Sequence, residues 1–294
     1  MTATPVPSAA GIHAPLRHAV GDYIVTALSD GHDDLGPPLL VDADGATPPG
    51  ADRPLRVEVN AFLIQGRGRT VLVDTGAGHF MAPTLNRLAG GLHRLGVTPS
   101  AIDTVLLTHL HPDHAGGLVD AAGAAVFDVA EIRVHARELG FWDSDEQLGR
   151  APAPMRPAFH AARAALAPYR ARVAPFEGGD LLPGIVPVPL FGHTPGHCGF
   201  LIDGGGSHQL LIWGDIVHRL AEQIADPDIG VAYDTDGAAA RIARRALCDR
   251  IAADALPFTG MHVPFPQIGT LTRAGSGFAF RRAPASAGFQ ETTS

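Results

Sequence analysis

The chain of 294 residues lacks a long apolar run, and no stretch approaches the roughly 18 residues of a membrane-spanning helix. It is also poor in basic residues, because 22 Lys plus Arg against 30 Asp plus Glu leave a net charge of −8. That balance argues against a nucleic-acid-binding surface. The first residues lack the basic start and apolar core of a secretory signal. We therefore predict a cytoplasmic protein without a membrane or nucleic-acid partner, and leave open the removal of a native leader.

Cysteine is scarce as well. Cys198 and Cys248 do not have the spacing of a metal-type pair, so we predict that both are buried free thiols. By contrast, 35 Gly and 25 Pro predict extensive loops, and hydrophobic residues at 46% suffice for a full core. We predict a flexible segment at residues 1–18, one domain at 19–282 and a flexible tail at 283–294. Residues 33–56, rich in Pro, Gly and Asp, predict a long loop within that domain.

Hydrophobic patterning predicts the secondary structure. Short apolar or β-branched runs indicate strands at residues 23–29, 57–64, 70–74, 103–108, 131–135, 185–190, 199–202 and 209–213. Helical periodicity indicates helices at about residues 83–95, 156–167 and 237–253, and Asp234-Thr-Asp236 supplies N-cap chemistry for the last of them. Strands dominate each half, with helices between and after them. This order predicts an α/β protein with two packed sheets flanked by helices, a four-layer α/β/β/α sandwich.

One motif concentrates metal-type ligands, namely Thr108-His-Leu-His-Pro-Asp-His114. Imidazoles and carboxylates are the ligands that zinc and its first-row neighbours bind. Because Pro112 cannot donate to a strand ladder, the preceding strand should end near His109, with the ligands on the following loop. The turn at Pro112 would then bring Asp113 and His114 toward a point next to His109 and His111. The spacing therefore suggests two adjacent metals.

Three further candidates stand downstream, where apolar runs meet loops rich in Gly or Pro: His193, Asp215 and His262. Scaffolds present functional side chains at such boundaries. With the motif residues His109, His111, Asp113 and His114, they complete a set of seven ligand positions, which suits a site with two metals.

These motifs, together with Asp74 in Val-Leu-Val-Asp-Thr-Gly, resemble those of the metallo-β-lactamase-fold hydrolase superfamily. Softer matches at residues 59–64, 167–169, 181–185, 214–218, 233–237 and 262–266 are similar to its methyl parathion hydrolase-like branch. The resemblance runs over roughly residues 19–280. The true β-lactamases of this fold use a cysteine ligand where Asp215 stands here, which argues against antibiotic hydrolysis as the main activity.

The resemblance and the ligand chemistry together imply two divalent metal ions per chain, with Zn favoured and Mn, Co or Fe as alternatives. One ion would be held by His109, His111 and His193, the second by Asp113, His114 and His262, and both by Asp215. A metal-bridging hydroxide would be the nucleophile, and Asp113 would orient it or receive its proton. Asp113 and Asp215 are therefore the predicted catalytic carboxylates. Asp74 would accept a hydrogen bond from a ligand imidazole, and His197 would have a structural role or support the site from its outer shell.

Other residues are candidates for the outer shell or the substrate pocket. His218 follows Asp215 closely and could contact substrate or support the site, with a structural role equally open. Phe141 and Trp142 lie where the resemblance suggests a pocket-lining aromatic, although a core pair is an equal alternative. Phe62 and Phe265 are further aromatic candidates.

The resemblance implies a hydrolase of small-molecule esters: lactones, aryl esters and, in addition, phosphotriesters. One alternative is a thioester hydrolase resembling glyoxalase II, although the long basic C-terminal helices expected there are not evident. The other is a di-iron redox enzyme of the same fold, which usually carries an appended flavin domain for which 294 residues leave no room. Relatives in the branch resemble homodimers, so a homodimer is expected here.

Overall fold

The structure is a computed structural model of the chain, and it describes residues 16–37, 39–49, 51–283 and 290–291. Its strands are β1 (Leu16–Val20), β2 (Tyr23–Leu35), β3 (Leu40–Val41), β4 (Leu55–Gly66), β5 (Arg69–Val73), β6 (Thr104–Leu106), β7 (Glu131–His135), β8 (Val173–Phe176), β9 (Ile185–Pro189), β10 (Cys198–Asp203), β11 (Gln209–Ile212), β12 (Gly230–Val231), β13 (Phe258–Thr259), β14 (Gly269–Ala274), β15 (Gly277–Arg282) and β16 (Gln290–Glu291).

The α-helices are α1 (Leu88–Arg94), α2 (Pro112–Ala115), α3 (Ala136–Trp142), α4 (Asp145–Arg150), α5 (Arg156–Leu166), α6 (Leu220–Ala225) and α7 (Gly237–Asp254). In the described part of the chain, none of these helices is long and apolar enough to cross a membrane.

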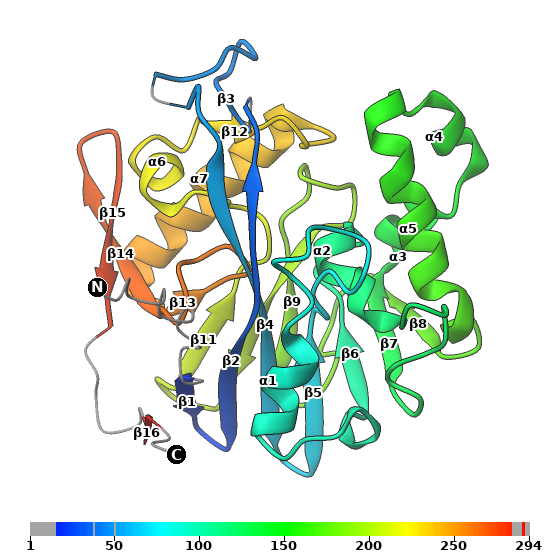
Figure 1. The fold of residues 1–294 in the computed structure, drawn as a ribbon. Helices are drawn as coiled ribbons and strands as arrows, with labels where there is room; N and C mark the ends of the chain where they lie inside the picture. The colour runs from blue at the N-terminus through cyan, green and yellow to red at the C-terminus, as the bar shows by residue number, and fades with distance from the viewer. Residues whose placement is uncertain (1–15, 38, 50, 284–289, 292–294) are drawn as a thin grey trace, which may run out of the picture.

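Two sheets pack face to face and carry helices on their outer faces (Figure 1). Within the described residues, the larger sheet has the strand order β16-β1-β2-β4-β5-β6-β7-β8, and the smaller has the order β15-β14-β13-β11-β10-β9. Helices α1, α3, α4 and α5 lie on the side of the larger sheet, whereas α6 and α7 lie on the side of the smaller one. The predicted four-layer α/β/β/α arrangement is confirmed.

Three hydrophobic clusters fill the spaces between these layers. One lies between the sheets and includes Val25, Ile64, Phe200 and Ile212, all nearly inaccessible to solvent. A second joins the outer face of the larger sheet to its helices. The third joins the outer face of the smaller sheet to α6 and α7, with Trp213 at its centre. Both faces of each sheet are buried, which explains why several strands are continuously apolar in the sequence.

The sheets extend into three segments that were predicted to be loop or flexible. The predicted loop at residues 33–56 is shorter, because β2 continues to Leu35 and β4 begins at Leu55. A register shift between Ser29 and Gly31 lets β2 bend and remain paired with β4. Strand β1 also includes residues 16–18 of the segment predicted to be flexible, and β16 pairs with β1 from within the predicted tail. The rest of the first segment and residues 284–289 and 292–294 of the tail lie outside the described residues.

The topology brings chemistry-bearing loops to one edge of the sandwich. Strands β5, β6, β7 and β8 run parallel, so the segments that follow them emerge at the same edge. In the smaller sheet, β11 and β13 also run parallel and precede the segments that carry Asp215 and His262. Open α/β sheets commonly present ligand sites at the carboxyl ends of their strands.

Candidate metal centre

The His-Leu-His-Pro-Asp-His motif begins just after β6, which ends at Leu106 rather than near His109 as predicted. Thr108 fixes this turn, because its backbone N–H and its hydroxyl donate to the Asp74 carboxylate at 2.8 and 2.7 Å. His111 is the N-cap of α2, and Pro112 takes the first helical position. A backbone N–H at this position has no partner within the helix, so proline costs no hydrogen bond there. The short helix then turns Asp113 and His114 toward a second point in space, as the spacing predicted.

The first cluster consists of His109, His111, His193 and Asp215, whose ligand atoms lie within 4.8 Å of one another. His111 Nδ1 is 2.9 Å from His109 Nε2 and 2.9 Å from His193 Nε2. Asp215 Oδ2 is 3.6 Å from His109 Nε2 and 3.6 Å from His193 Nε2. Four ligand atoms at about 2.0–2.1 Å from a zinc ion would form a tetrahedron with edges of about 3.3 Å, which these spacings bracket.

The second cluster consists of Asp113, His114, Asp215 and His262. His114 Nε2 is 3.2 Å from both Asp113 Oδ2 and Asp215 Oδ2. His262 Nε2 is 3.0 Å from Asp215 Oδ2 and 3.6 Å from Asp113 Oδ2. The same oxygen of Asp215 therefore belongs to both clusters, which is the arrangement that a bridging carboxylate requires.

The electrostatics of the two clusters differ. Burial lowers the pKa values of His109 and His111 well below the usual histidine range. Burial opposes charge on His114 too, but the carboxylates of Asp113 and Asp215 raise its pKa well above that range. Burial likewise opposes ionisation of Asp215, yet the surrounding histidines hold its pKa well below that of an ordinary carboxyl group.

The residues present fit a pair of divalent ions. The Nε2 atoms of His109 and His193 each lie 2.9 Å from His111 Nδ1, so the three nitrogens can direct their lone pairs at one ion. Among the described residues, His114 Nε2 and Asp215 Oδ1 are buried without a hydrogen-bond partner. Buried polar atoms are normally satisfied, so such an atom in a cluster of ligands indicates an absent binding partner. The two clusters therefore have the ligands of a dinuclear metal site.

Three of the proposed ligand imidazoles, those of His114, His193 and His262, are each oriented by a hydrogen bond at Nδ1. His114 Nδ1 lies 2.7 Å from Asp74 Oδ2, the contact that the sequence predicted for Asp74. His193 Nδ1 lies 2.8 Å from Asp234 Oδ1, and His262 Nδ1 lies 2.5 Å from the Glu58 carbonyl oxygen. Such partners fix which ring nitrogen carries the proton and so leave Nε2 free for a metal. Sequence analysis named Asp234 only as part of the N-cap segment before α7, whose N-cap is Asp236, and did not identify it as a partner of a ligand.

Glu138 of α3 is a further residue that sequence reasoning missed. Its carboxylate is fully buried, and it accepts four hydrogen bonds, from Leu110 N, Trp142 Nε1, Thr194 Oγ1 and Gly196 N. Burial raises the pKa of Glu138, whereas the four donors stabilise its charged form and lower it. A glutamate in a helix of the sequence reads as a solvent-exposed residue, so only the burial reveals it.

His197 and His218 lie beside the clusters in different ways. His197 uses both ring nitrogens on the backbone: Nδ1 lies 2.9 Å from Leu190 O, and Nε2 accepts from Asp215 N at 2.8 Å. It therefore has no lone pair left for a metal. His218 Nε2 lies 3.2 Å from Asp215 Oδ2, while its Nδ1 is buried with no hydrogen-bond partner among the described residues. The structure thus brings His218 into contact with the shared carboxylate.

The predicted pocket aromatics are placed differently from one another. Phe62 is 1% exposed and lies in the core between the sheets, so the expectation that it lines a substrate pocket is corrected to a packing role. Phe265 is partly buried against the same core. Phe141 lines an open groove of about 730 Å³ together with Arg137, Phe191, residues on either side of His193 and residues just after Asp234. Phe141 therefore remains a candidate for substrate contact.

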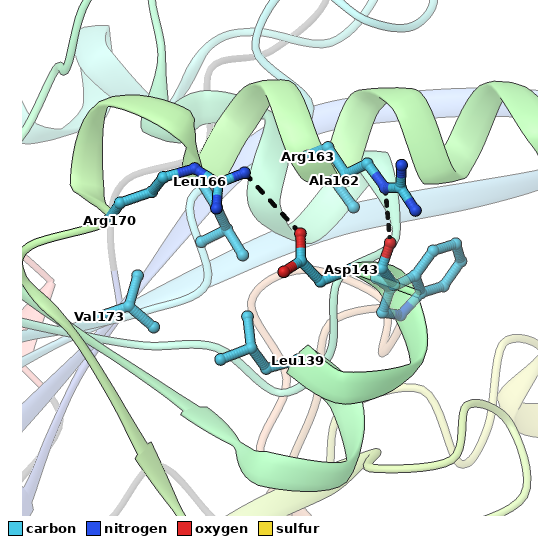
Figure 2. A pocket seen from close by; sticks show the side chains of 8 residues that line it. Leu139, Asp143, Ala162, Arg163, Leu166, Arg170 and Val173 are labelled. Atoms are coloured by element: carbon cyan, nitrogen blue, oxygen red, sulfur yellow. Dashed lines mark hydrogen bonds and ion pairs between the residues drawn. The ribbon is translucent and has the colours of Figure 1, made fainter. Parts of the chain in front are cut away.

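Trp142 is buried, and its ring meets the edge of His111 at a centroid distance of 5.4 Å. Its other surroundings include a small cavity of about 140 Å³ between α3, α5 and β8. Figure 2 shows this cavity, which is lined by apolar side chains and by Arg170 and Asp143. The Arg170 guanidinium lies 3.8 Å from Asp143 Oδ1. Trp142 is not among the described residues that line the groove, so it supports His111 from behind instead of forming the substrate wall.

Both cysteines are buried free thiols, as predicted. Neither belongs to a metal-type cluster among the described residues.

Residues 55–256 match the model of the metallo-β-lactamase superfamily, and the chain belongs to this superfamily. Among solved structures, it is similar to the hydrolase AbOPH of the β-lactamase superfamily, with 28% identity, a TM-score of 0.82 and coverage of 92% of this chain and 98% of that one. It also shares its fold with AidC, a dizinc quorum-quenching lactonase, at 23% identity and a TM-score of 0.80, with coverage of 91% and 97%.

Among curated proteins, the acyl-coenzyme A thioesterase MBLAC2 of Gallus gallus is 31% identical over 164 residues, which are 54% of this chain and 57% of that protein. The protein YobT of Bacillus subtilis (strain 168) is 26% identical over 165 residues, or 55% and 63% of the two chains. The matches thus span less than two thirds of the length of these relatives. The superfamily includes metal-dependent hydrolases, lactonases and a thioesterase among them.

Proposed function

We propose that this protein is a dinuclear metal-dependent hydrolase whose main substrates are lactones and aryl esters, with phosphotriester cleavage as a secondary activity. The observation that carries the proposal is the sharing of Asp215 Oδ2 between two clusters with tetrahedral spacing. The likeness to AbOPH over nearly the full length of both chains supports a hydrolase, and the shared fold of the lactonase AidC supports esters of this type. We assign the chain to the methyl parathion hydrolase-like branch on the same grounds.

One metal would be held by His109, His111 and His193, the second by Asp113, His114 and His262, and Asp215 would join them. When bound, two divalent ions supply an acidified water as the nucleophile and a Lewis acid for the oxygen that gains charge. We favour zinc, because imidazole and carboxylate ligands in tetrahedral spacing suit it, while manganese, cobalt and iron accept the same ligands.

The chain's own residues set the direction of attack. Of the seven ligands, His111 and Asp113 are the two that keep partial exposure, so substrate approaches from their side. Asp113, at 17% side-chain exposure, would orient the nucleophile and receive its proton. His218 Nε2 lies 3.2 Å from Asp215 Oδ2 and would hold the carboxylate in its shared position.

The charge around the site selects for neutral substrates. In the described part of the chain, the ion pairs of Asp113 and Asp215 are with histidines, and none is with an arginine. A dianionic phosphate is normally held by several arginine or lysine side chains, and Arg137 is the one such side chain among the described residues that line the groove, so phosphomonoesters are disfavoured. A neutral triester or lactone needs no such partner.

Thioester hydrolysis is the second candidate, and one observation favours it. MBLAC2, an acyl-coenzyme A thioesterase, is 31% identical over about half of this chain. A thioester presents an electron-poor carbonyl to the same nucleophile, so the walls of the groove would decide between an ester and a thioester.

A substrate panel tests the proposal. Zinc-loaded protein would be assayed against aryl esters, aliphatic lactones including acyl-homoserine lactones, methyl parathion, a cephalosporin and an acyl thioester, with Asp215→Ala as the negative control. We expect the highest kcat/KM on lactones or aryl esters. Turnover confined to the thioester would favour the second candidate. Turnover confined to the cephalosporin, or no turnover of any ester or thioester, would contradict both.

A further inference from the structure

One buried carboxylate joins the two loops that supply every histidine of the first cluster. Glu138 Oε1 accepts from Leu110 N at 3.0 Å, and Leu110 stands between His109 and His111. Glu138 Oε2 accepts from Thr194 Oγ1 at 2.7 Å and from Gly196 N at 2.8 Å, just after His193. These loops are distant in the sequence, and each is irregular backbone that no strand ladder holds at this point.

We propose that Glu138 is a positioning residue that sets the spacing of the three-histidine metal position, and that it controls metal affinity there selectively. The inference rests on the proposed two-metal site. Glu138 touches no proposed ligand, so its effect is transmitted through the backbone of Leu110 and of the loop after His193.

Two packing features support this role. Gly196 approaches α3 so closely that a Cβ atom at this position would collide with the backbone of Glu138. A glycine is therefore required for the loop to reach the carboxylate. Trp142 Nε1 also donates to Glu138 Oε1, at 2.5 Å, and the Trp142 ring meets the edge of His111. The same carboxylate thus holds the ring that supports one of the three ligands.

The second cluster has anchors of its own. His114 is held by the Asp74 carboxylate on its ring and by Thr75 on its carbonyl oxygen, to which the Thr75 N–H and hydroxyl donate at 2.7 and 2.9 Å. His262 is held by the Glu58 carbonyl oxygen. None of these contacts includes Glu138, so loosening the first position should leave the second intact.

Asp30 provides a matched control. It too is a buried carboxylate that accepts four hydrogen bonds, all from backbone N–H groups, of Ala77, Asn86, Arg87 and Leu88. It ties a loop to the larger sheet and contacts none of the proposed ligands. Asp30→Asn and Glu138→Gln each turn an oxygen that accepts two bonds into an NH2 group that faces two donors. Both variants should lower thermal stability, but only Glu138→Gln should affect a metal position.

The experiment measures Zn²⁺ affinity by competition with a chromophoric chelator, in the full chain. Each variant is made in two backgrounds: His262→Ala leaves the first position as the intact one, and His193→Ala leaves the second. We expect Glu138→Gln to weaken zinc binding by about 10- to 100-fold in the His262→Ala background and to leave it unchanged in the His193→Ala background. Asp30→Asn should leave affinity unchanged in both.

Thr194→Val removes only the hydroxyl bond to Glu138 and keeps the shape of the side chain. It should weaken the first position less than Glu138→Gln does, and it provides the test should Glu138→Gln fail to fold. Three results would overturn this inference and leave the proposed function standing. They are an equal loss of zinc affinity in both backgrounds, a loss of the same size in Asp30→Asn, and unchanged zinc affinity in folded Glu138→Gln and Thr194→Val. Binding of fewer than two Zn²⁺ ions by the wild-type protein would overturn the proposed function and the inference with it.

Discussion

Replacing His197 with alanine separates a structural histidine from a metal ligand in the same motif. Burial lowers the pKa of His197 to about 3, so the ring is neutral under working conditions, donating through Nδ1 to Leu190 O and accepting at Nε2 from Asp215 N. His193, four positions earlier in Gly-His-Thr-Pro-Gly-His, instead directs Nε2 at His111 Nδ1 within the first cluster. The two histidines should therefore respond to substitution in different ways.

The cost of His197→Ala follows from the bonds it removes. Two buried backbone groups, Leu190 O and Asp215 N, would each lose their partner to the imidazole, at about 1–3 kcal/mol apiece. The expected loss in the free energy of unfolding is therefore about 2–6 kcal/mol, before any cavity penalty. A protein of ordinary stability, about 5–15 kcal/mol, would remain mostly folded over much of that range. His193→Ala instead removes a ligand of the first metal position, together with the hydrogen bond to Asp234.

Two measurements decide the matter. Urea unfolding of metal-free protein gives the stability change without contributions from metal binding. Elemental analysis after dialysis gives the metal content, for which we expect two ions in His197→Ala and one in His193→Ala. Equal metal loss in both variants under conditions where both are folded would refute the assignment within this motif. An unchanged urea midpoint for His197→Ala would refute the hydrogen-bond argument.

Further predictions concern metal, protons, thiols and assembly. Asp215→Ala removes a shared ligand, so elemental analysis should find both ions weakened and activity should fall by orders of magnitude. The pKa values of His114 and His262 are raised, so protons compete with zinc at the second position and zinc affinity there should fall as pH falls. Calorimetry in buffers of different ionisation enthalpy should detect the release of protons on binding. Zinc binding at this position that does not depend on pH would contradict the prediction. Burial raises the pKa of Cys198 well above its usual value and that of Cys248 to about 12, so a thiol reagent at pH 8 should modify neither cysteine in native protein and both after denaturation. Light scattering should find a homodimer, and a monomer at micromolar concentration would contradict that expectation.

Much of the fold could be predicted because local patterns agree with it. The strand at residues 131–135 and the start of α7 after Asp236 are placed as predicted, since an apolar β-branched run and an N-cap are local signals. The hairpin of β14 and β15 was not predicted, although Gly275 with a positive φ marks its turn. Its strands are half exposed, and their buried residues with large side chains are Leu271 and Phe278, so the apolar signal was weak.

The ligand set was readable for a similar reason. Four of its residues fall within one short motif, and the others stand beside glycine or proline at the ends of apolar runs. The side chains that orient them were not readable, because Asp234 and Glu138 meet their partners only through the tertiary fold. Nothing in the helical segment Glu138-Leu-Gly-Phe-Trp142 indicates that the Glu138 carboxylate is buried. It is buried because the loop after His193 packs against it and donates hydrogen bonds to it.

The residues that would bind the metals differ from those that would choose the substrate. The seven ligands and their hydrogen-bonded partners specify two metal positions, and they would serve a lactone, a triester or a thioester alike. The groove beside them is built from other parts of the chain, with Arg137 stacked 4.7 Å over Phe191 on one side and Phe141 nearby. In the described part of the chain, the side chains of Arg137, Phe141 and Phe191 form no hydrogen bond, ion pair or ring contact with a proposed ligand, so they can change without loss of metal. Substrate choice among proteins of this fold should therefore follow α3, α4 and the loop before His193 more closely than the metal motifs.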